Sequence, residues 1–344
     1  MSVRFATPEE ISHWDTFILK NPDGGNVFSS YEYAEQKETG GYTHRFLFVD
    51  TLAVTVLEKN TPPIGKLWYL PKGPNVTNSK ALFELLKQIK PFAAKRNVFV
   101  VRIETELPRS QQPTLRRHGL RKAAAIIPNP STITLDLSPS LNDILMSLPQ
   151  KGRHAIRRAE RDGVTVERVA STDKNCKIMY ALLSETAEGQ FGIRKFDYYK
   201  TFWQRFEKAG LGQLFFASFE GKIVAGAYAM TYGTKSTYKD GASIRKRTAY
   251  GASHFLQWNV IEWAKSNGAF IHDFCGSPPS DELSNPEHPH YGIGQFKTAF
   301  NKTVTDYIGC YDFVIAPLRY KAWTKLGERV YRHFYYKRTK DYYY

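Results

Sequence analysis

The chain has 344 residues, 42% of them hydrophobic, and its 48 Lys and Arg residues outnumber 33 Asp and Glu residues, giving a formal net charge of +15. This length supports about two compact domains, and the lack of an 18-residue apolar run excludes a membrane-spanning helix. The excess positive charge favours partners that carry negative charge, namely RNA, a nucleotide-linked substrate or an anionic membrane face.

Neither an export signal nor a metal site is predicted. The start of the chain, Met1 to Glu10, lacks the charged-then-apolar layout of a secretion signal, so we expect a cytoplasmic protein. The three cysteines are far apart and form no Cys-x-x-Cys pair, which argues against disulfides and against a thiolate metal site. His288 and His290 share a loop with prolines and lack a third ligand, so a polar surface is favoured over a zinc site.

The first regular segment reads as strand, helix and strand. A strand is predicted from Leu67, an apolar-periodic helix over Ala81–Ala94, and a second strand over the β-branched run Val98–Val101. A helix between two strands is the usual crossover that joins parallel neighbours in a sheet, and this crossover is nearly always right-handed.

A break in the pattern follows between residues 128 and 149. Pro139 and Leu148-Pro149 are loop signals, and they precede a strongly basic helix. We therefore place a domain boundary near residue 145. The first domain is predicted to comprise residues 1–145 with 317–344, the C-terminal helix returning to it, and the second to comprise residues 146–316.

The basic helix is predicted between Lys151 and Arg161. Arg153, Arg157 and Arg161 recur every four residues and so share one helix face. Repulsion along that face favours an anionic partner such as tRNA. The alternative is a solvated helix whose charges are balanced by acidic neighbours such as Glu160.

A second strand, helix and strand occurs between residues 236 and 274. The predicted strands are Thr237–Gly241 and Phe270–Phe274, and the helix between them is Ser253–Asn267. Tyr238 to Ile271 spans 33 residues, and Tyr69 to Val100 in the first segment spans 31. The matching order indicates a duplicated α/β domain. Coincidence is the alternative, because this order is common in α/β proteins.

The loop before the second helix has the position of a coenzyme A site in GNAT acyltransferases. Those enzymes bind the pyrophosphate on backbone amides of a glycine-rich turn at a helix N-terminus. Here the loop runs from Arg247 to Ala252, and Tyr250 stands where the first glycine is expected. The fold can therefore be GNAT-like with an acyl carrier other than coenzyme A.

The C-terminal stretch predicts an amphipathic helix with one packed side and one basic side. The side expected to pack consists of Leu318, Ala322, Leu326, Val330 and Phe334. Arg332 and Lys337 lie elsewhere on the helical wheel and are candidate tRNA contacts. Several tyrosines, including Tyr342–Tyr344, offer faces on which bases could stack, although terminal residues are commonly disordered.

Several sequence blocks follow one another in the order found in one known family. The main blocks are Leu148–Val166, Gly192–Tyr199, Tyr238–Ser243, His272–Gly276, Gly294–Asn301 and Tyr307–Asp312, with weaker matches at Phe28–Lys37 and Pro71–Pro74. Together they resemble the FemABX family of peptidoglycan interpeptide-bridge aminoacyltransferases.

The resemblance implies an α/β fold of two tandem GNAT-like domains. Each domain would hold a mixed sheet flanked by helices, and the chain would match the compact FemX-like members without a coiled-coil arm. The implied activity is transfer of an amino acid from aminoacyl-tRNA to the stem-peptide amine of a peptidoglycan precursor. The acceptor is a UDP-N-acetylmuramoyl pentapeptide or a lipid-linked muropeptide. Aminoacyl-tRNA is the co-substrate and no cofactor is expected, in a monomer with peripheral contact with the inner membrane face.

The resemblance also implies site residues. Lys297 matches the family lysine near the reacting centre, where a cation can stabilise an oxyanion, and Phe296 matches its neighbour. The alternative for Lys297 is a surface ion pair.

Five further residues are implied as contacts of the acceptor. Arg194 and Tyr198, with Lys37, match residues that hold the muropeptide and its diphosphate. Tyr238 matches a strand tyrosine near the peptide, with a core position as the alternative. Glu104 matches an acid near the incoming amine, which it would deprotonate or orient.

Two departures from the family pattern and two other functions stay open. Lys72 stands where Arg is usual, and Cys275 replaces a small residue after Asp273-Phe274. A coenzyme A-dependent GNAT N-acyltransferase is one alternative function, and a non-catalytic RNA-binding protein is another.

Overall fold

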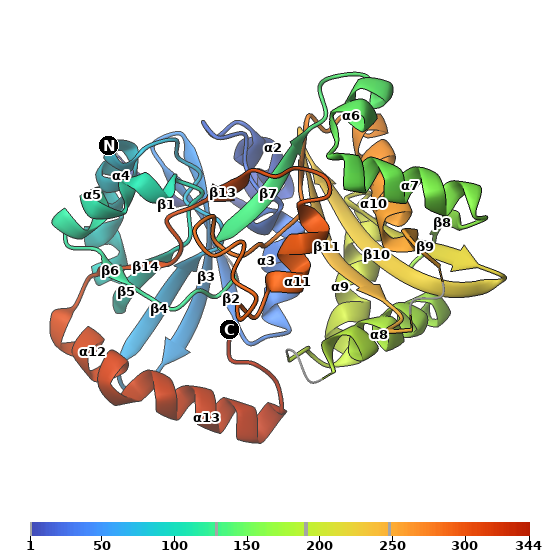
Figure 1. Cartoon of the computed structure of the whole chain (residues 1–344). Helices are drawn as coiled ribbons and strands as arrows, with labels where there is room; N and C mark the ends of the chain where they lie inside the picture. Colours follow the sequence, from blue (N-terminus) through green and yellow to red (C-terminus); the bar gives the residue numbers. More distant parts are fainter. Residues whose placement is uncertain (1, 128–129, 189–191, 247–248) are drawn as a thin grey trace. The chain divides into compact units, whose positions relative to one another are not determined.

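A computed structural model describes residues 2–127, 130–188, 192–246 and 249–344. The chain forms two compact units, the first comprising Met1–Pro130 with Asp306–Tyr344 and the second comprising Ser131–Thr305 (Figure 1). Each unit contains a seven-stranded sheet with helices packed against it.

The sheet of unit 1 is mixed, with strand order β1-β2-β3-β4-β5-β14-β6. Only β4 and β5 are parallel, and α4 connects them. The strands are β1 (Val3–Phe5), β2 (Thr43–Val49), β3 (Leu52–Thr61), β4 (Gly65–Leu70), β5 (Val98–Ile103), β6 (Arg121–Lys122) and β14 (Tyr311–Val314). The helices are α1 (Pro8–Ser12), α2 (Trp14–Leu19), α3 (Tyr31–Glu38), α4 (Ser79–Ala94), α5 (Gln112–Arg117), α12 (Pro317–Ala322) and α13 (Glu328–Thr339).

Helix α4 illustrates why these residues fold as they do. The side chain of Asn78 accepts a hydrogen bond from the backbone of Ala81 and so caps the first turn. Leu82, Leu86 and Ile89 recur at helical spacing and are fully buried in the core of unit 1. Burial of each such side chain stabilises the fold by about 1.5–3 kcal/mol.

The sheet of unit 2 has the order β13-β7-β12-β11-β10-β9-β8. Its strands are β7 (Ser131–Asp136), β8 (Thr165–Val169), β9 (Gly212–Phe219), β10 (Lys222–Tyr232), β11 (Lys235–Ser243), β12 (Ile271–Asp273) and β13 (Val304–Asp306). Its helices are α6 (Leu141–Ser147), α7 (Gln150–Arg161), α8 (Asp173–Ala187), α9 (Phe196–Lys208), α10 (Ala252–Ser266) and α11 (Tyr291–Lys297).

The two sheets share one plan. In each sheet a series of antiparallel strands ends at a strand that a helix connects to a parallel neighbour. These connections are β4-α4-β5 in unit 1 and β11-α10-β12 in unit 2. An antiparallel strand from elsewhere in the chain then pairs with the second of these, β14 with β5 and β7 with β12. The predicted fold class is confirmed: two tandem GNAT-like domains, each a mixed sheet flanked by helices.

The unit boundaries differ from the predicted ranges at both junctions. Strand β7 lies in the second sheet, so unit 2 begins at Ser131 rather than near residue 145. Strand β14 pairs with β5, so the chain rejoins unit 1 at Asp306 rather than at residue 317. The proline signals that marked the predicted seam instead flank α6, a helix within unit 2.

The longest helices among the described residues of unit 2 are α8 and α10, with 15 residues each, so that part of the chain has no coiled-coil arm. Throughout the described ranges, every helix is too short or too polar to cross a bilayer.

The prediction for the C-terminal helix was wrong about which side packs. Leu318, Leu326 and Phe334 are 85%, 62% and 65% exposed. Tyr320 and Trp323 are buried instead, because these larger side chains reach the core of unit 1. Tyr343 is also buried, and Tyr344 donates a hydrogen bond of 2.7 Å to Glu328, so neither is free to stack on a base as expected.

Candidate active site

Lys297 is buried at the C-terminal end of α11, with 5% of its surface exposed. Its ammonium group donates hydrogen bonds to two backbone carbonyl oxygens, those of Cys275 at 2.7 Å and Gly276 at 2.5 Å. An ammonium group has three N–H donors, so a third remains after these two contacts. The predicted alternative of a surface ion pair does not describe this lysine.

The turn after β12 points those carbonyl oxygens at the lysine. Cys275 and Gly276 both have positive φ, 55° and 88°, and for Cys275 this is a strained conformation that glycine would adopt more easily. Asp273 holds the turn, because its Oδ1 accepts hydrogen bonds from the backbone of Cys275 at 2.7 Å and from Thr132 Oγ1 at 2.5 Å. The strained turn is therefore fixed by side-chain contacts from β7 and β12.

The electrostatics of this site lower the pKa of the lysine and keep the neighbouring histidine neutral. Burial lowers the pKa of Lys297 to about 8, although Cys275 and Asp273 act in the opposite direction. His272 is fully buried, and burial with the nearby Lys297 lowers its pKa to about 3, so the ring is neutral. Gln257 Nε2 lies 2.8 Å from His272 Nε2 and Ser236 Oγ lies 2.7 Å from its Nδ1. These contacts fix the orientation of the ring.

Close packing holds α11 in place. Phe296, the predicted neighbour of the lysine, is partly buried and packs against His254 and Phe300. A Cβ atom on Gly152 would lie 1.9 Å from the backbone oxygen of Ala299, so α7 touches the turn that follows Lys297 directly. The structural roles of Gly152, Asp273 and His272 in this site were not predicted. For Gly152, its position within a predicted helix was a signal that the helix packs closely there.

Arg194 and Tyr198 form a second cluster of unit 2, in which Arg194 precedes α9 and Tyr198 lies in its first turn. The guanidinium carbon of Arg194 lies 4.6 Å from the ring centroid of Tyr198. Lys239, which was not predicted, packs over Phe202 and forms an ion pair of 3.0 Å with Asp240. Burial lowers the pKa of Lys239, but Asp240 and the neighbouring tyrosines outweigh burial and raise it, so this lysine stays charged.

Tyr238 occupies a mainly structural position on β11. It packs against the core of unit 2, and burial raises the pKa of its phenol. Gly241 leaves room for the ring, since a Cβ atom there would lie 1.7 Å from the Tyr238 hydroxyl oxygen. This geometry matches the core alternative more closely than an acceptor contact.

Glu104 is buried at the end of β5 in unit 1, where it accepts several hydrogen bonds. The donors are the Tyr69 hydroxyl, the backbone N–H of Ile126 at 2.6 Å and that of Ile127 at 3.2 Å. The carboxylate also lines a pocket of unit 1 that includes Lys72 and Tyr307.

Lys37 is buried on α3 of unit 1, with its ammonium group 5.1 Å from the centroid of Tyr42 and 5.9 Å from that of Tyr33. The two aromatic faces stabilise a positive charge at this point of the unit.

The predicted basic face of α7 is divided. Arg153 is partly buried and donates to the carbonyl oxygens of Met146 at 2.7 Å and Leu148 at 3.0 Å, so it caps the end of α6. Arg157 and Arg161 are exposed, and Asp162 rather than Glu160 lies 3.5 Å from Arg161. On α13, Arg332 and Lys337 are both exposed.

The start of α10 differs from a glycine-rich phosphate turn. Arg247 and Thr248 lie outside the described residues. The guanidinium carbon of Arg158 lies 4.7 Å from the ring centroid of Tyr250, and a Cβ atom on Gly251 would lie 2.2 Å from the backbone oxygen of Ala155. Helix α7 therefore packs against the first turn of α10, where a GNAT enzyme would hold pyrophosphate.

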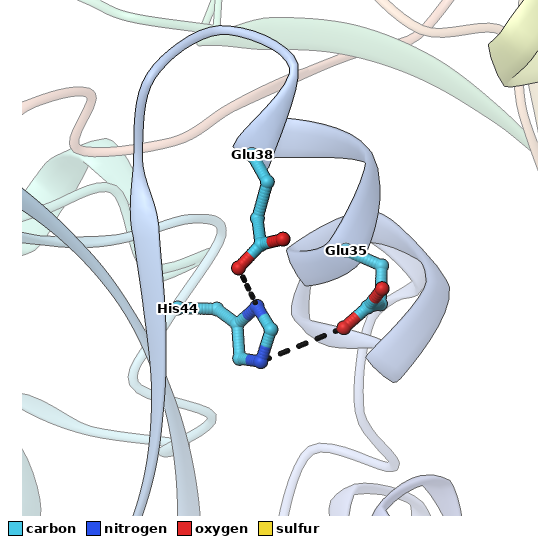
Figure 2. A group of neighbouring side chains, drawn as sticks. All are labelled: Glu35, Glu38 and His44. Atoms are coloured by element: carbon cyan, nitrogen blue, oxygen red, sulfur yellow. Dashed lines mark ion pairs between the residues drawn. The ribbon is translucent and has the colours of Figure 1, made fainter.

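One group of side chains in the described ranges has the composition of a metal site. Figure 2 shows His44 between two carboxylates of α3, with Nδ1 2.9 Å from Glu38 and Nε2 3.5 Å from Glu35. The carboxylates face opposite nitrogens of the ring, whereas a single ion would bind one nitrogen and draw both carboxylates to that side. The geometry is that of two separate contacts, one at each ring nitrogen, rather than of one shared ion.

The model of the FemAB family matches residues 111–220 and 212–327, which include Lys297, Arg194 and the turn after β12. The chain belongs to the FemAB family.

Two relatives and two solved structures define the likeness further. The UDP-N-acetylmuramoylpentapeptide-lysine N(6)-alanyltransferase of Weissella viridescens is 26% identical over 332 residues, covering 90% of this chain and 95% of the relative. The lipid II:glycine glycyltransferase of Staphylococcus aureus strain MRSA252 is 21% identical over 388 residues, with coverages of 88% and 90%. A crystal structure of FemX matches with a TM-score of 0.79 at 19% identity, over 95% of this chain and 100% of that chain. The structure of L-PGS from Bacillus licheniformis matches with a TM-score of 0.54 at 15% identity, with coverages of 94% and 98%. These structural matches show the fold, and the resemblance to a compact FemX-like member is confirmed.

Proposed function

We propose that this FemAB-family protein is an aminoacyltransferase that forms an amide bond between an amino acid carried on tRNA and a stem-peptide amine of a peptidoglycan precursor. The names of the two relatives support the reaction class, since one is a glycyltransferase and the other an alanyltransferase. The observation that carries the proposal is the buried ammonium group of Lys297, held by two carbonyl oxygens with a third N–H left over.

The reaction requires little beyond orientation and charge stabilisation. The amine attacks the ester carbonyl, the new C–N bond forms, and the ester C–O bond breaks with its oxygen taking up a proton as the tRNA ribose hydroxyl. Negative charge develops on the carbonyl oxygen in between, and Lys297 would stabilise it from a site already shielded from water. Phe296 would contribute by fixing the end of α11.

The acceptor would be held by a cluster of cationic side chains. Arg194 can donate two parallel hydrogen bonds to a diphosphate, Tyr198 would hold its guanidinium group in place, and Lys239 adds a second charge nearby. Lys37 and Glu104 stay predicted contacts of the precursor on unit 1.

The co-substrate is proposed to be aminoacyl-tRNA, with no further cofactor. Arg157 and Arg161 supply exposed positive charge for the tRNA backbone, whereas Arg153 would act indirectly by holding α7 to α6. We propose a monomer acting in the cytoplasm on a soluble UDP-linked or a lipid-linked muropeptide.

The proposal is tested by incubating the protein with a mixed pool of aminoacyl-tRNAs and either acceptor, followed by mass spectrometry of the muropeptide. We expect a mass increase equal to one aminoacyl residue, abolished by prior treatment of the tRNA with ribonuclease. Acetyl-coenzyme A is the competing donor, and an acetyl increment without tRNA would contradict the proposal.

A further inference from the structure

The C-terminal run of helix leaves three of its large apolar side chains in solvent. Helix α12, a π-helical turn at Trp323–Gly327 and helix α13 follow each other without a break, in red in Figure 1. Leu318, Leu326 and Phe334 are 85%, 62% and 65% exposed. Three large apolar side chains exposed on one short segment need an explanation, because each would stabilise the fold if it were buried.

These side chains form a ridge beside the packed side of the helix. The packed side is held to unit 1 by buried Trp323 and by hydrogen bonds from Tyr331 to Pro62 and from Tyr335 to Gly40. Positions 318, 322, 326, 330 and 334 are four residues apart, and in a regular α-helix they would drift by about 40° per step around the axis. The π-helical turn fits more residues into one turn and so reduces that drift.

A basic ridge runs next to the apolar one. Most of its residues immediately precede a residue of the apolar ridge in the sequence. It consists of Lys321, Lys325, Arg329, His333 and Lys337, all exposed. The acidic residue of α13, Glu328, is partly buried, where it lies 3.4 Å from Arg102 and accepts a hydrogen bond from Tyr344. The solvent-facing side of the helix is therefore apolar and positively charged.

We propose that this helix docks on an anionic lipid bilayer. The ridge of Leu318, Leu326 and Phe334 would enter the headgroup region, while the basic ridge would lie against lipid phosphates and carboxylates. RNA would also be attracted by the basic ridge, but it offers no apolar phase for the leucines, so the pair of ridges favours a membrane. The inference does not depend on the transferase activity.

The test uses the full chain and sedimentation with vesicles of phosphatidylcholine alone or with about a third phosphatidylglycerol. We expect binding to the anionic vesicles only, weakened by salt. The triple variant Leu318→Ser, Leu326→Ser and Phe334→Ser should reduce binding by about tenfold or more, since each loses apolar area that enters the bilayer. The triple variant Lys325→Gln, Arg329→Gln and Lys337→Gln should also reduce it.

Phe270→Ser is the matched control, because Phe270 is 57% exposed on unit 2 and should leave vesicle binding unchanged. Thermal unfolding and a tRNA-binding assay accompany each variant. Equal binding to neutral and anionic vesicles, or full binding by the apolar triple variant, would overturn the proposal. So would a basic triple variant that loses tRNA binding but keeps vesicle binding.

Discussion

The ammonium nitrogen of Lys297 lies 2.7 Å from the carbonyl oxygen of Cys275, a residue with positive φ on the turn after β12. The contact joins the end of α11 to the end of a central strand of unit 2. It satisfies a buried charge with backbone dipoles rather than with a carboxylate, which leaves the positive charge available to a substrate oxygen.

The pH dependence of transfer should reflect the lowered pKa of this lysine, about 8. A lysine-like acceptor amine becomes about tenfold more reactive per pH unit up to its own pKa near 10.4. Above pH 8 the loss of the Lys297 proton offsets that gain. We expect the initial rate at low acceptor concentration to rise up to about pH 8 and then level off. Uncatalysed aminolysis measured in parallel should keep rising, and an enzymatic rate that rises with it to pH 9.5 would contradict the assignment.

The same shift should appear in stability. In the unfolded chain the Lys297 pKa returns to 10.5, so between pH 8 and 10.5 the unfolded state binds more protons and stability rises with pH. Below pH 8 the buried charge lowers the free energy of unfolding, and this loss of stability disappears as Lys297 deprotonates at higher pH. Relative to Lys297→Met, the wild type should gain about 3 kcal/mol in unfolding free energy across this window. Denaturant titrations of both proteins at pH 7, 9 and 10.5 measure it, and a constant difference would refute the shift.

Gly152→Ala should destabilise unit 2 although alanine is the better helix former. The added Cβ would lie 1.9 Å from the oxygen of Ala299, and relief requires α7 to move away from the turn after Lys297. We expect a loss of about 1–3 kcal/mol together with slower transfer. Gly292→Ala, in α11 with nothing within 4 Å of the new atom, is the control and should be neutral or stabilising. Equal stability of the two variants would show that the contact is not tight.

Glu104→Gln should destabilise unit 1, because both carboxylate oxygens accept hydrogen bonds. An amide must turn its NH2 group either toward the Ile126 N–H or toward the Ile127 N–H and the Tyr69 hydroxyl, and each choice leaves a backbone N–H without its acceptor. The expected cost is about 1–3 kcal/mol by denaturant unfolding. Glu106→Gln, which weakens a 3.6 Å ion pair with Lys72, should cost less. A Glu104→Gln protein as stable as the wild type would mean that these hydrogen bonds to the carboxylate do not stabilise unit 1.

The strand–helix–strand cores were predictable because local pattern decides them. The apolar period of α4 and the β-branched run of β5 are sufficient, and the parallel pairing follows from the crossover. The sequence did not predict to which sheet β7 and β14 belong. Their pairing partners are distant in sequence, and each strand alone fits either sheet.

The site was predictable only in part, for a similar reason. Lys297 came from a motif, but the positive φ of Cys275 that supplies its hydrogen-bond acceptors leaves no mark in the sequence. The C-terminal helix was misassigned because Leu318 and Trp323 both fit an apolar period, and only the fold decides which one the core accepts.

The most direct test of the account is the transfer rate of Lys297→Met with saturating aminoacyl-tRNA and muropeptide, compared with Lys302→Met, which changes an exposed lysine of the same unit. We predict a loss of about 100-fold or more for Lys297→Met, in the range seen when a single oxyanion-stabilising donor is removed. Muropeptide affinity should be retained, and Lys302→Met should match the wild type. Undiminished transfer by folded Lys297→Met protein would contradict the central role of this lysine.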